Sequence, residues 1–221
     1  MSSSTKGKTA ILVGATGLVG SHILQLLLSD QRYSKVLVFH RRKTGVSHPK
    51  LIEHVIKFDE LNIWRHMLKG DELYSALGTT LKKAGSENAQ WKIDYDHQLD
   101  AAKAAASNGV YSYALVSSLG ASKGNKNFYL NMKGRLDKEV QKIGFKKVLI
   151  VRPSFLKGDR SESRFWERVG IIAANLFTVL PPLKKYKPIH ARQVAQAMIN
   201  GINETETKTI LEGEEVFGLA E

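Results

Sequence analysis

Short apolar runs alternate with longer segments of helical spacing along the first two thirds of the chain. The runs cover residues 9–13, 35–39, 53–58, 72–77, 111–117 and 147–151. They are mostly continuous rather than alternating, which is typical of strands in a parallel sheet that is covered on both faces. The helical segments between them include residues 18–28, 91–107 and 127–143. This order predicts an α/β fold with a doubly wound parallel sheet.

The regular alternation ends at Pro153. Beyond it we predict helices at 165–180 and 191–201 and short strands at 187–190 and 210–217. No linker or repeat divides the 221 residues, and this length suits one domain. We therefore expect a single domain over residues 1–221, with a cofactor-binding core at 9–153 and a smaller substrate-side segment at 154–221.

A glycine-rich stretch, Gly-Ala-Thr-Gly-Leu-Val-Gly at residues 14–20, joins the first predicted strand to the first predicted helix. Its three glycines suit a tight turn, a close approach of the backbone to a pyrophosphate, and close packing of helix on strand. Backbone N–H groups and the positive end of the helix dipole would face the phosphates. This context predicts the dinucleotide site of a Rossmann fold. The residues assigned to it are Gly14, Thr16, Gly17, Leu18, Val19 and Gly20.

The end of the second predicted strand indicates which dinucleotide is bound. An NAD site usually places an acidic residue about 20 residues after the glycine turn, where it bonds the ribose 2′-hydroxyl. Here the strand runs into Arg41 and Arg42, and guanidinium groups suit the oxygens of a 2′-phosphate. We therefore expect NADP(H). Asp59, after the third strand, is a candidate contact for the adenine amino group or has only a loop or capping role.

A serine, a tyrosine and a lysine form the candidate reaction centre. Tyr129 and Lys133 are four residues apart on a predicted helix and share a face. A lysine beside a phenol lowers its pKa from about 10, so the tyrosine can exchange a proton with a carbonyl or alcohol near neutral pH. A serine at the end of the fifth strand can hydrogen-bond the same oxygen. Ser118 is preferred over Ser117, although periodicity does not decide between them.

These motifs together resemble the short-chain dehydrogenase/reductase superfamily, and more narrowly its atypical branch related to the Tat-interacting-protein oxidoreductases and their fungal mitochondrial relatives. The stretches that carry the resemblance are residues 14–20, 41–42, 76–80, 116–121, 129–134 and 152–153. The resemblance implies that Leu77 and Gly78 line the cofactor and that Lys133, beside Tyr129, also bonds the nicotinamide ribose. It implies that the segment with Leu156 and Arg160 closes over cofactor and substrate. The substrate stays open, and the short chain puts a sugar nucleotide in doubt.

Composition narrows the remaining choices. Lys and Arg number 33 against 21 Asp and Glu, a formal charge of +12, but the basic residues are scattered and lack an accompanying aromatic platform. We therefore expect no nucleic-acid partner. There is no cysteine, which excludes disulfides and thiolate chemistry and favours a reducing compartment. No apolar signal segment opens the chain, so we expect a cytoplasmic location. The seven histidines show no ligand spacing, and no metal is expected.

Two functions follow from these residues. The first is an NADPH-dependent oxidoreductase that reduces a small carbonyl compound (an aldehyde, ketone or quinone) by hydride transfer, with Tyr129 as the proton donor. The alternative is an NADPH-binding regulatory or redox-sensing protein that acts through a protein or membrane partner without turnover. The apolar stretch at 169–183 motivates the alternative, although it is shorter than the about 20 residues of a membrane span. No transmembrane span is expected, while peripheral membrane contact and a protein partner stay open.

Overall fold

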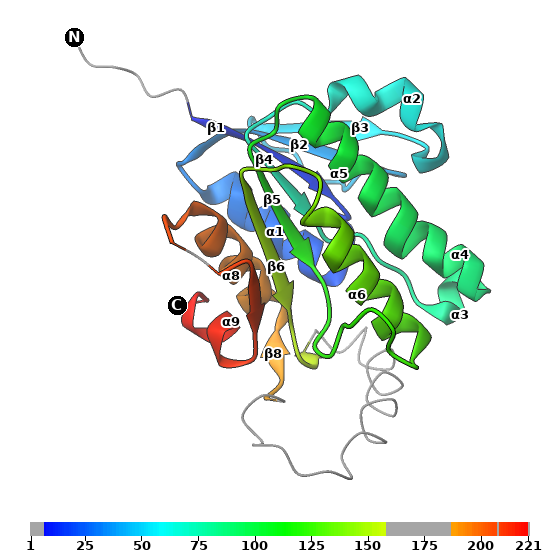
Figure 1. The fold of residues 1–221 in the computed structure, drawn as a ribbon. Coiled ribbons are helices and arrows are strands. Elements are labelled where there is room, and N and C mark those ends of the chain that lie inside the picture. Colours follow the sequence, from blue (N-terminus) through cyan, green and yellow to red (C-terminus); the bar gives the residue numbers. More distant parts are fainter. Residues whose placement is uncertain (1–6, 158–186, 207, 221) are drawn as a thin grey trace.

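A sheet of seven parallel strands runs through the part of the chain that this computed structural model describes, residues 7–157, 187–206 and 208–220 (Figure 1). The strand order is β3-β2-β1-β4-β5-β6-β9, which confirms the predicted doubly wound α/β sheet. A separate pair of two-residue strands, β7 and β8, lies beyond the sheet. The strands are β1 Lys8–Val13, β2 Tyr33–His40, β3 Leu51–Val55, β4 Glu72–Ser75, β5 Ser112–Val116, β6 Lys147–Arg152, β7 Leu156–Lys157, β8 Ile189–His190 and β9 Ile210–Glu212.

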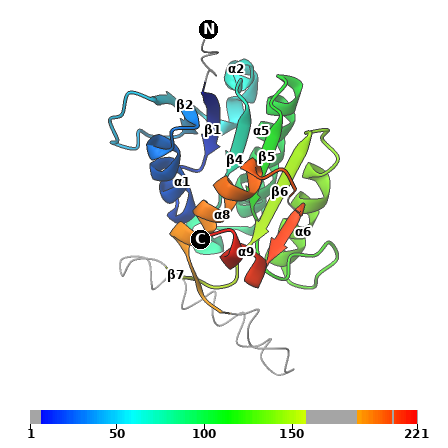
Figure 2. The ribbon, with the colours of Figure 1, turned by 90° about the vertical axis from the view of Figure 1, so that its left-hand side faces the viewer.

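Helices cover both faces of the sheet. Figure 2 shows α1 and α8 on one side and α5 and α6 on the other. Shorter helical turns fill the connections, and the 92–96 segment is a turn of π-helix. The α-helices are α1 Leu18–Ser29, α2 Leu61–Trp64, α3 Leu81–Ala84, α4 Glu87–Trp91, α5 His97–Ser107, α6 Phe128–Val140, α8 Ala191–Asn203 and α9 Glu214–Gly218. The 3-10 turns are Phe58–Glu60 and Arg65–Met67.

Strand β1 shows why the strands read as continuous apolar runs. Ala10 and Leu12 belong to the core under α1 and α8, whereas Ile11 and Val13 belong to the core under α5 and α6. All four side chains are fully buried. Because successive side chains point to opposite faces, a strand covered on both sides has no position left for a polar residue.

Several predicted elements differ from the structure in type or in where they begin and end. The predicted strand 210–217 is wrong beyond its third residue, because Gly213 has a φ of +57° and begins the turn into α9. The predicted strand 53–58 is β3, which begins at Leu51 and ends at Val55. The predicted helix 91–107 is interrupted, because the chain widens into the π turn Lys92–Asp96 before α5 begins. The predicted helix 165–180 lies outside the described residues.

Part of the segment after Pro153 returns to the sheet. β9 pairs with β6, and α8 packs against α1 in the core on that face. The sheet is therefore completed by residues that follow the predicted cofactor-binding core. The boundary between a core at 9–153 and a substrate-side segment at 154–221 stays a prediction.

Candidate cofactor and proton-transfer site

The sheet has a switch point at β1. This strand lies between β2 and β4: the chain runs outward from β1 to β2 and β3 on one side, and then crosses back to add β4, β5 and β6 on the other side. In open α/β sheets, ligands bind at such a point, outside the carboxyl ends of the strands. The glycine-rich turn after β1 and the loop after β4 both begin at this edge.

The turn after β1 has no room for side chains at its first and last glycines. Gly14 has a φ of +88°, and a Cβ there would lie 2.4 Å from the carbonyl carbon of Ala76. A Cβ at Gly20 would lie 2.0 Å from the Gly14 carbonyl oxygen. At Gly17 a Cβ would meet only two carbonyl oxygens, at 3.3 Å and 3.7 Å. The two outer glycines are thus required by packing, and the middle one leaves its side of the turn open.

The start of α1 fits an anionic group. Gly17 is the N-cap residue, and no side chain caps the helix. The first N–H groups of a helix lack intrahelical partners, and the helix dipole is positive at this end. Thr16 and Gly17 are exposed, Leu18 is partly buried and Val19 is buried, so the turn meets solvent at its tip. These observations fit the pyrophosphate of NAD(P)H, with residues 16–20 as the holding segment.

The loop after β4 links this turn to the reaction centre. Residues 76 and 77 pack on Gly14, since a Cβ at Gly14 would lie 2.4 Å from the Ala76 carbonyl carbon and 2.5 Å from the Leu77 nitrogen, and Gly78 follows with its Cα facing Asp94. A Cβ at Gly78 would lie 3.2 Å from Asp94 Oδ1. The backbone N–H of Thr79 donates to Asp94 Oδ2 at 2.8 Å. The predicted cofactor-lining residues Leu77 and Gly78 therefore lie between the glycine turn and a buried carboxylate.

Tyr129 and Lys133 lie on α6 and share a face, as their spacing predicts. Lys133 is buried, and its Nζ atom lies 5.9 Å from the centroid of the Tyr129 ring. The same Nζ lies 3.6 Å from Asp94 Oδ1, and Asp94 is buried as well. This separation is an ion pair rather than a hydrogen bond. The structure thus brings the predicted pair together and adds a carboxylate that the sequence analysis did not single out.

Burial sets the direction of the pKa shift for Tyr129 and Asp94, whereas charged neighbours set it for Lys133. It raises the pKa of Tyr129, and the nearby Lys133 does not lower it enough to compensate. Burial also raises the pKa of Asp94, although Lys133 and the Thr79 N–H act in the other direction. Burial alone would lower the pKa of Lys133, but Tyr129 and the carboxylates raise it overall. The net shift of the phenol is therefore opposite to the one expected from the lysine alone.

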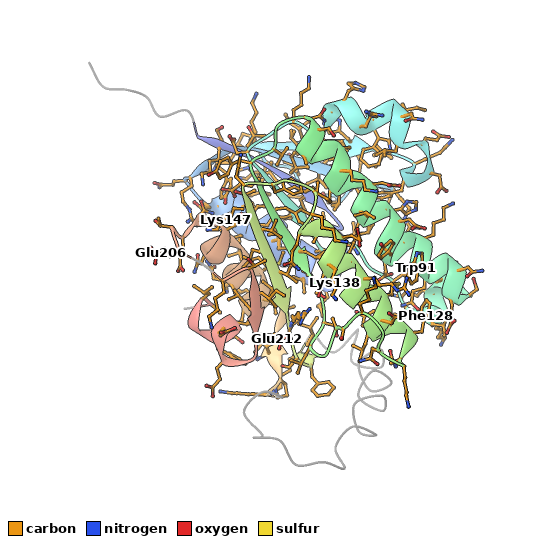
Figure 3. All side chains as sticks on the ribbon, viewed as in Figure 1. Trp91, Phe128, Lys138, Lys147, Glu206 and Glu212 are labelled. Atoms are coloured by element: carbon orange, nitrogen blue, oxygen red, sulfur yellow. The ribbon has the colours of Figure 1, made fainter. Side chains whose placement is uncertain are left out.

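Aromatic packing sets the distance between the π turn and α6. Trp91, at the end of α4, lies 4.7 Å from Tyr95 and 6.1 Å from Phe128, measured between ring centroids. Figure 3 shows Trp91 and Phe128 on the same side of the molecule; Trp91 comes directly before the π turn that holds Asp94, and Phe128 begins α6, which carries Lys133. On α6 itself, Gly134 admits the neighbouring loop, since a Cβ there would lie 2.3 Å from the Ser122 carbonyl carbon.

The two candidate serines differ in their surroundings. Ser117 is buried, and its hydroxyl faces Asp137 on α6 without completing a hydrogen bond. Burial raises the pKa of Asp137 despite Ser117 and despite Arg152, whose Nε donates to Asp137 Oδ2 at 2.8 Å. Ser118 is only partly buried, and its hydroxyl makes one long hydrogen bond, 3.4 Å, to the Leu119 carbonyl. Ser118 is therefore the more accessible of the two, and its catalytic role stays a prediction.

Arg41 and Arg42 follow β2 on an exposed stretch. Neither side chain forms an ion pair or hydrogen bond with any residue that the structure describes. The loop that carries them is held by Glu53 of β3, whose Oε1 accepts from Thr44 N at 2.7 Å and from Thr44 Oγ1 at 2.6 Å. Buried His40 adds Nε2 at 3.4 Å from the same oxygen. Two unpaired guanidinium groups on an anchored loop fit a phosphate.

The remaining sequence candidates are Asp59, Leu156 and Arg160. Asp59 pairs with Lys92 at 2.6 Å, so its carboxylate already has a partner. Leu156 is partly buried in β7, and Arg160 lies outside the described residues, as does the 169–183 stretch. Within the described part of the chain, His, Asp and Glu form no group of three that could hold a metal ion. Among the described helices, none has both the length and the apolar character that a membrane crossing needs.

Asp94 escaped the sequence analysis, because its spacing alone does not mark it as part of a site. Gln90, Asp94 and Gln98 follow one another at intervals of four and are all buried. Residues at this spacing share one face of a helix, but a polar face usually meets solvent, so the pattern does not reveal that this face is buried. The sequence analysis did single out Lys133, the partner of Asp94 in the ion pair.

A family model described as NAD(P)H-binding matches residues 14–205. Among curated proteins, "Protein FMP52, mitochondrial" of Coccidioides immitis is 35% identical over 207 residues, which cover 87% of this chain and 84% of the relative. The protein of the same name from Meyerozyma guilliermondii is 34% identical over 211 residues, covering 91% and 90%.

Solved structures share the fold at much lower identity. A UDP-N-acetylglucosamine 4-epimerase from Methanobrevibacter ruminantium superposes with a TM-score of 0.70 at 15% identity, over 97% of this chain and 81% of the other. A short-chain dehydrogenase/reductase superfamily protein from Agrobacterium tumefaciens, with bound NAD, gives a TM-score of 0.65 at 12% identity, over 91% and 76%. These likenesses confirm a Rossmann-type fold of the dehydrogenase and epimerase kind.

The expected cytoplasmic location is wrong in the light of these relatives, which are named as mitochondrial proteins. The expectation rested on the missing cysteine and the missing apolar leader. A composition without cysteine constrains redox chemistry, and many compartments share that chemistry. Neither feature therefore identifies the compartment in which the protein is located.

Proposed function

The chain belongs to the NAD(P)H-binding family and to the FMP52 proteins, and from this premise we propose that it is an NADPH-dependent oxidoreductase that reduces a small carbonyl compound. The observation that carries the proposal is the buried Lys133 beside Tyr129, next to the loop that packs on the glycine turn. The names of the relatives support a mitochondrial location for this chain.

In this proposal the chain's residues handle the proton. Bound NADPH supplies the hydride that goes to the carbonyl carbon. The Tyr129 hydroxyl donates its proton to the carbonyl oxygen, so that hydride and proton together give an alcohol. Ser118 hydrogen-bonds the same oxygen while charge develops on it. Lys133 remains charged and favours the phenolate that is left.

Arg41 and Arg42 support NADPH rather than NADH as the cofactor. Their guanidinium groups are exposed and unpaired among the described residues, on a loop that Glu53 anchors. We expect Arg41→Ala and Arg42→Ala each to weaken NADPH binding by about tenfold, because a charge-assisted bond to phosphate contributes about 1.5–3 kcal/mol when formed and less at an exposed site. NADH binding should not change, and Lys43→Ala serves as the control. Equal losses for both nucleotides would contradict the assignment.

The reductase is tested by NADPH consumption with a panel of aldehydes, ketones and quinones. Wild type is compared with Tyr129→Phe and with Tyr111→Phe, a control because Tyr111 is exposed at the amino end of β5. We expect turnover in wild type and Tyr111→Phe and its loss in Tyr129→Phe, with NADPH binding retained in all three. If no carbonyl is reduced while NADPH still binds, the reductase proposal fails.

A second function has its own observation. The edge strand β3 exposes Ile52 and Val55, and Ile63 of α2 is also exposed. Apolar side chains along a sheet edge favour contact with a protein or a membrane surface. An NADPH-responsive binding protein would show partner or vesicle binding that changes with NADPH and persists in Tyr129→Phe. Binding indifferent to NADPH would remove this alternative.

A further inference from the structure

Asp94 is a buried carboxylate beside the proposed proton donor, and the proposed reaction does not use it. It lies in the π turn Lys92–Asp96, and its side chain is buried; such turns are frequent at functional sites. Its Oδ2 accepts from Thr79 N at 2.8 Å, and its carbonyl oxygen accepts from Gln98 Nε2 at 2.6 Å. Backbone and side chain are therefore both held, and Oδ1 is directed at Lys133. A buried carboxylate that is held in this way has a fixed position and orientation, which suits a role in the site.

We propose that Asp94 is a positioning residue that pairs with Lys133 and thereby keeps Tyr129 in its neutral phenol form, the form that donates a proton when a carbonyl is reduced. The inference rests on the proposed reductase function and deepens it by naming the protonation state of its proton donor. Oxidation of an alcohol at the same site would need Tyr129 as a phenolate base, which accepts the proton of the alcohol. The ion pair with Asp94 sets the pH at which the first form gives way to the second.

The charged groups that act on the Tyr129 phenol are Lys133, Asp94 and Asp137. Lys133 and Asp94 form one pair, at 3.6 Å. Asp137, one turn further along α6, forms a second pair with Arg152, which also bonds Glu212 on β9 at 2.6 Å. Asp94 is therefore the carboxylate paired with Lys133 itself, whereas Asp137 already has a cation of its own.

Without Asp94, the buried Lys133 cation would lose the carboxylate with which it forms an ion pair, and the remaining acid that acts on it, Asp137, is already paired with Arg152. Such a cation stabilises the phenolate strongly, because few water molecules screen it. With Asp94 in place, the lysine's attraction for the phenolate is partly cancelled, and burial then favours the neutral phenol. Asp94 thus selects the protonation state without touching the reacting atoms.

The test is to measure the pKa of Tyr129 by NMR, with 13C at the tyrosine Cζ and the Tyr129→Phe variant used to assign its signal. In wild type we expect the pKa of Tyr129 to lie above the usual value of about 10. In Asp94→Asn we expect it to fall by about one unit or more, because one negative neighbour is lost. Asn keeps an oxygen for the Thr79 N–H, so the turn should fold. Asp100→Asn, the same change at an exposed position on α5, should leave the value unchanged.

Two results would overturn the inference. One is a wild-type Tyr129 pKa below about 10, which needs no variant and so does not depend on how Asp94→Asn folds. The other is a folded Asp94→Asn protein whose Tyr129 titrates as in wild type. Both pKa measurements are made without substrate, so their failure can be distinguished from failure of the reductase proposal. If carbonyl turnover is found, its loss at high pH should begin at lower pH in Asp94→Asn, and absence of any turnover would count against the reductase alone.

Discussion

Each end of the sheet carries a group of tyrosine, carboxylate and lysine side chains, and the two groups differ in how fully their polar atoms are hydrogen-bonded. At the amino end, Glu72 accepts from Tyr33 at 2.6 Å, from Tyr74 at 2.7 Å and from Lys8 at 2.7 Å. The two phenols bond each other at 2.8 Å, and Asn203 of α8 donates to Tyr33 at 2.8 Å. Each polar group there is satisfied by several short bonds.

At the carboxyl end, the same kinds of residue use less of their hydrogen-bonding capacity on one another. Asp94 and Lys133 are separated by 3.6 Å, and Lys133 is 5.9 Å from the Tyr129 ring centroid. Tyr129 makes no side-chain hydrogen bond with the residues that the structure describes. A saturated network adds rigidity, whereas an unsaturated one retains donors for a ligand. The difference between the ends, rather than the residue types, separates a structural group from a candidate site.

Replacing the lysine of the carboxyl-end group should have the largest effect. Lys133→Met keeps the length of a buried side chain but removes the charge that favours the Tyr129 phenolate. We expect turnover to fall by about 10²–10⁴-fold, the range for general acid–base catalysis. Steady-state NADPH consumption measures the loss, and circular dichroism checks that the variant is folded. If Lys133→Met kept turnover within a few fold of wild type, the carboxyl-end group would not differ from the amino-end group in its importance for catalysis.

The acid of the amino-end group should affect stability and leave chemistry alone. Glu72→Ala removes the acceptor that two buried phenols and Lys8 share, and we expect a loss of about 2–4 kcal/mol in unfolding free energy. Urea denaturation measures it, with Glu60→Ala at an exposed position as the control. Turnover per folded molecule should not change. If Glu72→Ala were stable but inactive, the amino-end group would be needed for catalysis, and this would contradict the prediction.

Alkaline pH should lower the unfolding free energy mainly through the buried phenols of the amino-end group. Burial, together with Glu72, raises the pKa of Tyr33, and burial raises that of Tyr74 well above the usual value. Their folded pKa values exceed the unfolded value of about 10, so their stabilising contribution is complete below that pH and is lost as pH rises above it. Each protein is compared with its own unfolding free energy at neutral pH. Above pH 10, Tyr33→Phe should lose less unfolding free energy than wild type, by up to about 1.4 kcal/mol per pH unit. Equal slopes in denaturation series from about pH 9 to 11 would contradict this.

The sequence predicted the parts of the site that depend on local spacing. The glycine turn follows from a strand, three glycines and a helix, and Tyr129 with Lys133 follows from an interval of four on α6. Asp94 depends on a π turn, which apolar periodicity does not reveal. The net shift of the Tyr129 pKa depends on burial by elements far apart in the sequence. Local rules therefore located the residues, and tertiary packing decided how they titrate.

The fold shows the same division between local and distant causes. Continuous apolar runs predicted the central strands, because a strand covered on both faces leaves no polar position. The last predicted strand failed at Gly213, where a positive φ turns the chain into α9 although apolar residues continue beyond it. Pairing of β9 with β6 spans about 60 positions of sequence, as Arg152 opposite Glu212 illustrates, and no local pattern specifies it.

The smallest effect is expected for the lysine of the amino-end group. The Lys8 side chain is 43% exposed, so water screens its ion pair with Glu72, and Tyr33 and Tyr74 still satisfy that carboxylate. We expect Lys8→Met to cost about 0.5–1 kcal/mol of unfolding free energy, less at high salt, with turnover unchanged. The comparison with Lys133→Met is then direct, because the same substitution at two lysines, each paired with a buried acid, separates stability from catalysis. If Lys8→Met destabilised the protein by several kcal/mol, the amino-end group would depend on its exposed cation, and saturation of the buried phenols would no longer explain its rigidity.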